Sequence, residues 1–263
     1  MHEGVRSRRH DELARFLTSR RANLDPESCG LPPLRRRRRT PGLRRDEVSA
    51  LAGISTAYYT WIEQGRRFDV SSGVLEALAV ALRLNDVEST HLFTLAGKST
   101  PRHLTANVVL PARGGEAMLE FVRAFREGPA LLLTPWLEVA ASNARAGELL
   151  DLERGTNLAE AVLCGRATLR LANADRLAGA FVALLRRNYA NDVDNERFDE
   201  LILNLRARSD AFRRLWDAHV ITGTPLMRFE IRRRNAAGPT FEGMIVADPL
   251  ASHQFGLFMS QAG

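Results

Sequence analysis

Apolar residues recur at helical spacing through the first hundred positions of the chain. The pattern begins at Leu13, Phe16 and Leu17, which stand at i, i+3 and i+4. It returns in four later segments, around residues 48–52, 55–64, 74–82 and 87–95. Residues 25–42 hold four prolines and two glycines and are therefore expected to form a loop. The sequence predicts five short helices packed into an all-α domain.

Local signals give the ends of these helices. Gly53 interrupts the second periodic segment, and Ser55 is a good N-cap for the helix that follows. That helix is expected to run to about Gln64, with Gly65 as its terminator. Ser71 or Ser72 is expected to cap the fourth helix.

The pattern changes after a polar, proline-containing stretch at residues 98–105, which we interpret as a linker. Short apolar or alternating runs predict strands at residues 130–134, 137–141, 226–231, 241–247 and 255–259. Helical spacing is found at residues 118–125, 177–185, 198–205 and 212–216. The chain is therefore predicted to be multidomain, α followed by α+β. The predicted parts are a helical domain at 1–97, the linker at 98–105, and an antiparallel sheet with interposed helices at 106–263.

Composition is that of an ordinary soluble protein, with 45% apolar and 26% charged residues among 263. No apolar run is long enough for a membrane span, and no signal peptide is recognisable at the N-terminus. Cys29 and Cys164 are too few for a disulfide framework. We therefore expect a cytoplasmic protein without membrane contact.

Charge is distributed unevenly along the chain. Residues 1–105 carry 18 basic and 12 acidic side chains, whereas residues 106–263 carry 19 of each. The whole excess of +6 thus lies in the helical part, which favours a phosphate-bearing partner for that part. The run Arg35–Arg39 fits either a nucleic-acid contact or a solvated loop.

Residues 44–65, RRDEVSALAGISTAYYTWIEQG, fit a helix-turn-helix. Gly53 permits the sharp turn, and Ser49 or Ala52 is small enough for two helices to cross closely. Four apolar residues are expected to anchor the motif: Val48, Ile54, Tyr59 and Ile62. The remaining face of the second helix is free to enter a major groove. A plain αα-corner without DNA is the alternative, and the basic excess argues against it.

These motifs resemble a known family. The string RRTPGLRRDEVSALAGISTAYYTWIEQGR, together with SGVLEALAVALRL, resembles the XRE-type (lambda-repressor-like) transcriptional regulators that carry a MmyB-like ligand-binding domain. The match covers residues 38–96 closely. Beyond them it rests on Ala141-Ser-Asn143, on Leu185-Arg186 and on the spacing from Ser209 to Ile221, and the final 40 residues depart from the family pattern.

The resemblance implies a sequence-specific DNA-binding regulator. It further implies a homodimer on double-stranded DNA, with half-sites about 34 Å apart or a multiple of that distance. The expected base contacts are Thr56, Ala57, Tyr58, Thr60 and Trp61. The expected phosphate contacts are Arg38, Arg39, Arg44, Arg45, Gln64, Arg66 and Arg67. Tyr58 or Trp61 could instead pack on the scaffold. Glu63 is expected to bind an arginine of the first helix, because a carboxylate would repel phosphate.

For the second domain the resemblance implies a PAS-like fold that holds a small apolar, fatty-acyl-like ligand. The expected pocket walls are Phe121, Phe125, Trp136, Phe181, Leu185, Phe212, Trp216, Met227 and Phe229, although most could be ordinary core. Arg186 and His219 are candidate anchors for a carboxylate head group. Alternatively, Arg186 is a surface residue and His219 a structural histidine.

Other function classes have little support. There is no catalytic motif, no phosphate-binding glycine-rich loop and no metal-ligand spacing, so no enzymatic activity and no cofactor is expected. Asp192–Glu196 resembles the start of a calcium loop, but Arg197 stands where glycine is required. An RNA-binding protein and an enzyme fused to a DNA-binding domain are minor alternatives. A constitutive DNA-binding protein whose second domain only dimerises is the main one.

The arginine-rich first domain generates a test in solution. If about six phosphates are neutralised, the logarithm of DNA affinity should fall with the logarithm of salt concentration at a slope near −5. Fluorescence anisotropy of a labelled 30-bp duplex, titrated with the protein between 50 and 300 mM salt, measures that slope. A slope close to zero would contradict a phosphate-facing first domain.

Overall fold

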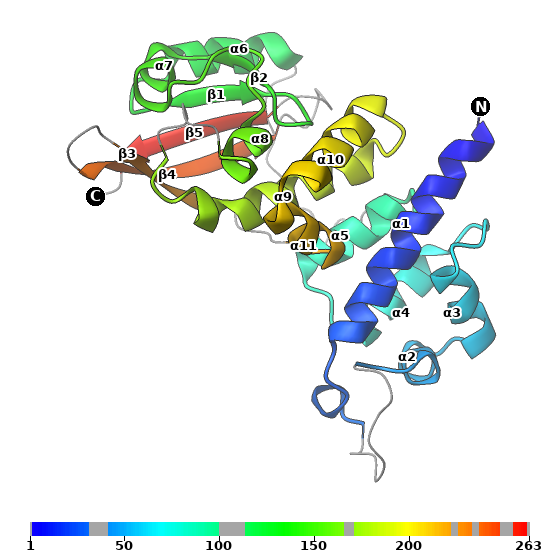
Figure 1. The fold of residues 1–263 in the computed structure, drawn as a ribbon. Helices are drawn as coiled ribbons and strands as arrows, with labels where there is room; N and C mark the ends of the chain where they lie inside the picture. The colour runs from blue at the N-terminus through cyan, green and yellow to red at the C-terminus, as the bar shows by residue number, and fades with distance from the viewer. Residues whose placement is uncertain are drawn as a thin grey trace. The chain divides into compact units, whose positions relative to one another are not determined.

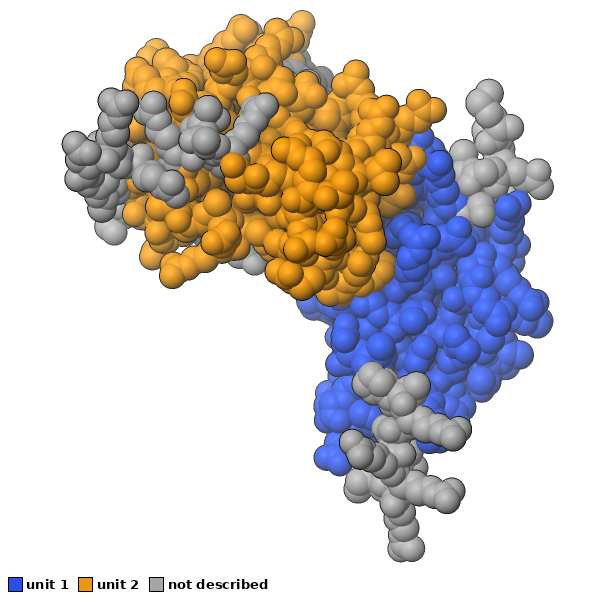
Figure 2. Space-filling model, in the orientation of Figure 1, with its two compact units in different colours: residues 1–106, 190–194 blue, residues 107–189, 195–263 orange. Residues whose placement is uncertain are grey.

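The computed structural model describes residues 2–31, 42–99, 114–165, 171–221, 226–232, 237–247 and 255–261. The chain divides into two compact units, one of residues 1–106 with 190–194 and the other of residues 107–189 with 195–263 (Figure 2). Apart from Lys98 and Ser99, the predicted linker lies outside the described residues. The predicted domain bounds therefore stay a prediction.

The first unit is helical (Figure 1). Among the described residues its α-helices are α1 (His2–Asn23), α2 (Arg45–Ala52), α3 (Thr56–Glu63), α4 (Ser72–Ala81) and α5 (Asp86–Leu95). A short 3-10 helix, η1 (Glu27–Cys29), follows α1. The residues that set the helical pattern form the core, among them Phe16, Leu17, Val48, Leu75, Leu78 and Leu92. The predicted all-α unit of five helices is confirmed.

Capping explains where these helices begin. The Ser55 side chain accepts a hydrogen bond from the Tyr58 backbone N–H at the start of α3, at 3.1 Å. Ser71, rather than Ser72, caps α4. Asn85 and Glu88 form a capping box at α5, in which each side chain binds the other residue's backbone N–H at 3.0 Å.

The second unit is built on a five-stranded antiparallel sheet in the order β2-β1-β5-β4-β3. The strands are β1 (Ala130–Leu133), β2 (Val139–Ser142), β3 (Leu226–Arg232), β4 (Ala237–Ala247) and β5 (Phe255–Gln261). Strand β5 joins the two hairpins, because it pairs with β1 on one side and with β4 on the other. The predicted antiparallel α+β fold is confirmed, and all five predicted strands are present.

Most helices of this unit lie between β2 and β3 in the chain. They are α7 (Ala144–Leu150), α8 (Leu158–Leu163), α9 (Ala174–Asn191), α10 (Glu196–Arg208) and α11 (Asp210–Asp217), whereas α6 (Gly114–Ala124) precedes the sheet. None of the helices among the described residues is long and apolar enough to cross a membrane.

Helix α6 packs on one face of the sheet. Met118 and Val122 of α6 form a buried apolar cluster with Ala130 and Leu132 of β1 and Phe258 of β5. The strand alternation places Ala130 and Leu132 on the same face, as the sequence pattern requires. Apolar burial therefore fixes which side of the sheet the helix covers.

Asn143, which the family resemblance singled out, ties three elements together. Its side-chain oxygen accepts hydrogen bonds from the backbone N–H of Ala130 at 3.0 Å and of Ala146 at 2.9 Å. Its amide nitrogen donates to the carbonyls of Phe125 and Gly128, each at 2.9 Å. One buried side chain thus caps α7, starts β1 and binds the segment after α6.

A second asparagine secures the edge of the sheet. Asn173 donates to the carbonyl of Arg228 at 2.8 Å and accepts from the backbone N–H of Glu230 at 3.1 Å. The Asn173 side chain therefore satisfies backbone groups on the outer side of edge strand β3.

Replacing Asn143 tests this role. Asn143→Ala leaves several buried backbone groups unsatisfied and is expected to destabilise the second unit by about 3 kcal/mol. Asn143→Asp keeps the acceptor but loses the donor, and should also destabilise. Urea unfolding followed by circular dichroism measures both, with exposed Asn204→Ala as the control. Equal stability of Asn143→Ala and the control would contradict the role of Asn143.

Candidate functional site

Helices α2 and α3 form a tight helix-turn-helix. Gly53 adopts a positive φ of 65° between them, a conformation that glycine reaches without strain. Ser49 and Ala52 are both buried, as close crossing of the helices requires. Of the predicted anchors, Val48, Tyr59 and Ile62 are buried, while Ile54 is half-buried.

The outward face of α3 carries the predicted base-contact residues. Thr56 and Ala57 are exposed, and the Trp61 side chain is 42% exposed. Thr60 is half-buried, and its hydroxyl donates to the Thr56 carbonyl at 2.7 Å. Tyr58 is also half-buried, with its ring 5.3 Å from that of Phe68. Three of the five are thus clearly accessible to a groove, and the roles of all five stay predictions.

The predicted phosphate-contact residues flank this face. Arg44, Gln64, Arg66 and Arg67 are all exposed at the surface. Arg45 differs from them, because its Nε donates to Glu63 while its side chain stays 47% exposed. Arg38, Arg39 and the rest of the arginine run lie outside the described residues.

Glu63 lies at the centre of a buried ion cluster, which we call the Glu63 cluster (Glu63, Arg21, Arg45 and Tyr59). Arg21 of α1 donates from Nε to Oε1 at 2.6 Å and from Nη2 to Oε2 at 3.2 Å. Arg45 of α2 donates to Oε2 at 2.6 Å, and the Tyr59 hydroxyl donates to Oε1 at 2.9 Å. The Glu63 side chain is completely buried. The expected partnership of Glu63 with an arginine of the first helix is therefore confirmed.

Burial and hydrogen bonding shift the pKa of the Glu63 carboxylate in opposite directions. Burial by itself raises the pKa of Glu63, but the bonds from Arg21, Arg45 and Tyr59 hold that pKa below its ordinary value. Burial, and then the Glu63 charge, raise the pKa of the Tyr59 phenol. The carboxylate is therefore ionised and the phenol protonated at neutral pH.

The Glu63 cluster has two consequences for α3. It joins α1, α2 and α3 at one point, and Arg21 also donates to the Leu43 carbonyl at 2.8 Å, just before α2. It also withdraws the only carboxylate of α3 from the surface. The outward face of α3 is thus left without negative charge.

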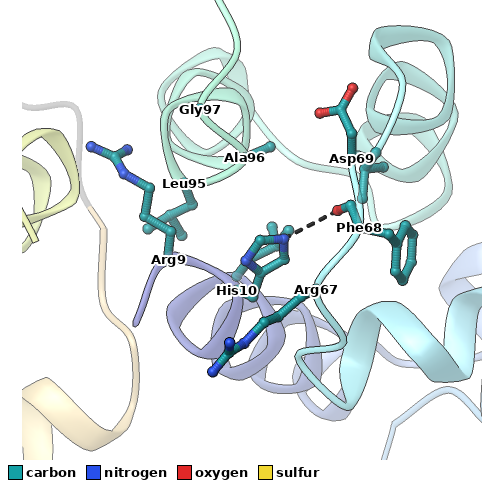
Figure 3. Close-up of a pocket in the computed structure, with 10 residues that line it drawn as sticks. Arg9, His10, Arg67, Phe68, Asp69, Leu95, Ala96 and Gly97 are labelled. Carbon is teal, nitrogen blue, oxygen red and sulfur yellow. Dashed lines mark hydrogen bonds between the residues drawn. The ribbon is translucent and has the colours of Figure 1, made fainter. Parts of the chain in front are cut away.

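A hollow of about 580 Å³ lies elsewhere in the first unit, between α1, the segment after α3 and the end of α5. His10 is one of the residues that line this hollow, and its Nε2 lies 3.1 Å from the Phe68 carbonyl oxygen. Figure 3 shows the guanidinium groups of Arg9 and Arg67 directed away from one another on two sides of His10. The Arg9 guanidinium donates instead to the backbone carbonyls of Thr94, Ala190 and Asn191.

In the second unit, the two predicted polar anchors lie together. Arg186 of α9 is buried, with 2% of its surface exposed, and its Nη1 is 3.0 Å from Nδ1 of His219. Its guanidinium carbon lies 4.0 Å from the centre of the Trp216 ring, and Nη2 donates to the Trp216 carbonyl. The alternative of a surface arginine at position 186 is therefore wrong.

Aromatic rings surround this polar group. Phe212 stacks on Trp216 at 5.2 Å, and Tyr189 meets both Trp216 and Phe198 edge to face. Trp136 reaches the group through Phe198, at 6.2 Å between ring centres. Phe198 was expected only as a core residue of the helical segment 198–205, and Tyr189 was not expected at the pocket.

The other predicted wall residues fall into two sets. Four are buried in the core of the unit: Phe181, Leu185, Met227 and Phe229. Phe121 and Phe125 instead contact each other and Phe258 of β5, and Phe121 is 56% exposed. These two contribute to the packing of α6 on the sheet. The eleven predicted residues are therefore not brought into one described cavity.

Comparison with known families identifies both units. Residues 115–262 match the model of the MmyB-like transcription regulator ligand binding domain. Residues 33–92 match a helix-turn-helix domain. No curated protein matches the chain.

Glu63→Gln tests the cluster. Removing the buried charge while leaving two arginines around it is expected to destabilise the first unit by about 3 kcal/mol. Because the pKa of Glu63 is lowered on folding, the carboxylate stabilises the fold above its ordinary value of 4.5, and this stability is lost as the pH falls below it. The variant should lack that acid-dependent loss.

Hydrogen exchange of peptides from α1 and α3, measured between pH 3.5 and 7, reports both effects. Glu76→Gln, the same change at an exposed position of α4, is the matched control. Exchange protection in Glu63→Gln equal to that of the control would contradict the stabilising role of the Glu63 cluster.

Proposed function

Because the chain belongs to the MmyB-like transcription regulators, we propose that it acts as a homodimer that binds operator DNA and senses a small apolar carboxylic acid. Its helix-turn-helix match and its ligand-binding domain together support a DNA-binding transcription regulator. The proposal goes beyond this in three respects: the dimer, the chemical class of the ligand, and a PAS-like fold of the second unit.

The observation that carries DNA binding is the electrostatic state of α3. Its outward face presents uncharged side chains, its one carboxylate is buried in the Glu63 cluster, and exposed arginines lie beside its C-terminal end. Uncharged polar groups can approach base edges while the flanking arginines bind phosphates. Thr56 and Ala57, at the N-terminal end of α3, stand where recognition helices contact bases.

The Arg186–His219 pair supports a carboxylate ligand. A guanidinium binds a carboxylate through two parallel hydrogen bonds, and this pairing is strongest where water is excluded. The neighbouring rings of Trp216 and Phe212 supply apolar surface beside this polar group. A fatty acid has both parts that such an environment favours, an anionic head and an apolar chain.

We expect ligand binding in the second unit to be thermodynamically linked to DNA binding in the first. A ligand changes operator affinity only if it binds one arrangement of the dimer more tightly than another. The competing reading is a second unit that only dimerises, in which case no ligand alters DNA binding.

A pair of ligands that differ only in the head group tests the proposal. The full chain is titrated with dodecanoic acid and with dodecan-1-ol, and bound ligand is counted by native mass spectrometry. The acid is expected to bind about tenfold more tightly, because only its head group forms charge-assisted bonds with Arg186. It should also change the affinity for duplex DNA in the anisotropy assay.

Arg186→Gln should reduce the difference between acid and alcohol, while exposed Arg176→Gln should leave it unchanged. Equal binding of the two ligands would exclude the carboxylate anchor. A dimer that binds DNA but neither ligand would instead favour the reading in which the second unit only dimerises.

A further inference from the structure

Trp61 and Arg66 form a stacked pair at the surface of the first unit. The Arg66 guanidinium carbon lies 5.2 Å from the centre of the Trp61 ring, within the range of a cation–π interaction. Both residues are exposed, so this contact is not a product of core packing. It brings together a residue with a predicted base contact and one with a predicted phosphate contact.

The backbone after α3 fixes this pairing. Gly65 has a positive φ of 66°, which reverses the chain at the end of the helix. The backbone N–H of Arg66 then donates to the Trp61 carbonyl at 3.1 Å. The backbone of Arg66 therefore lies directly beside that of Trp61.

The following residues hold the segment in place. The Phe68 backbone N–H donates to the Arg66 carbonyl at 3.1 Å, and the Phe68 ring contacts Tyr58 of α3. The segment that carries Arg66 is thus attached to α3 both before and after the arginine. A guanidinium on such a support loses less conformational freedom when it binds than one on a free side chain.

The place of the pair on α3 indicates which part of DNA it meets. Recognition helices contact base edges with their N-terminal residues, and Trp61 lies in the last turn, two residues before the end of α3. Stacking covers a planar face of the guanidinium but leaves the N–H groups at its edge able to donate. Those groups match the geometry of a phosphate.

We propose that Trp61 is a positioning residue that holds Arg66 for a DNA phosphate, and that it does not read a base. This inference rests on the proposed DNA-binding function and assigns a role within that surface. Base reading then falls to residues nearer the N-terminus of α3, and Trp61 and Arg66 act as one unit.

The test is a double-mutant cycle in the full chain. Wild type, Trp61→Ala, Arg66→Ala and the double variant are titrated onto a labelled 30-bp duplex of fixed sequence across a range of salt concentrations. Each single change is expected to weaken binding by roughly fivefold and to reduce the salt slope by about 1. The double variant should bind about as weakly as either single variant.

Two further variants separate positioning from other roles. Trp61→Phe keeps an aromatic face and should restore most of the affinity and the salt slope. Val80→Ala, which truncates an exposed apolar residue of α4, should change neither. Selection of bound sequences from a randomised 20-bp pool should give the same preferred sequence for wild type and Trp61→Ala.

Three results would overturn the proposal. A changed sequence preference in Trp61→Ala would make Trp61 a base reader. Additive losses in the double variant would make the two residues independent. Failure of the wild-type chain to bind any duplex would overturn the DNA-binding function itself, and the role of the pair with it.

Discussion

The first unit depends on one buried carboxylate. The Glu63 side chain has no exposed surface, and its charge is tolerable only because Arg21, Arg45 and Tyr59 surround it with donors. Those donors come from three helices, so the same bonds that neutralise the charge also fix α3 against α1 and α2. Because α3 loses its negative charge to the interior, its surface becomes compatible with phosphate. The orientation of α3 and the charge of its outward face therefore have a common origin.

The second unit uses neutral polar side chains for a similar purpose. Asn143 and Asn173 bind backbone groups at places where strands and helices meet, and they do so without a buried charge. Arg186 differs from these two asparagines, because it is charged and buried beside Trp216 and His219. A buried charge is costly, and pairing with the carboxylate ligand proposed above would lower that cost.

Local features were the most predictable from the sequence. Gly53 and Ser55 follow rules of turns and caps that involve only neighbouring residues, and five strands were found from apolar runs. Helices α7 and α8 were missed because seven and six residues are too few to set a helical period. The partners of Glu63 depend on helices that meet only in the folded chain. The residues predicted to line one pocket lie in different places because their contacts also form only in the folded chain. Nothing in the local sequence indicates that Phe121 packs with Phe258 rather than near Trp216.

The position of Tyr59 has an optical consequence. Its hydroxyl is a donor inside the Glu63 cluster, and burial beside a carboxylate raises the pKa of the phenol above its ordinary range. Phenolate absorbs ultraviolet light differently from phenol, so ionisation of Tyr59 in alkali would become visible only when the helices that enclose it separate. The protein thus contains, in one of its three tyrosines, an intrinsic chromophore that reports the opening of its DNA-binding unit without any added label.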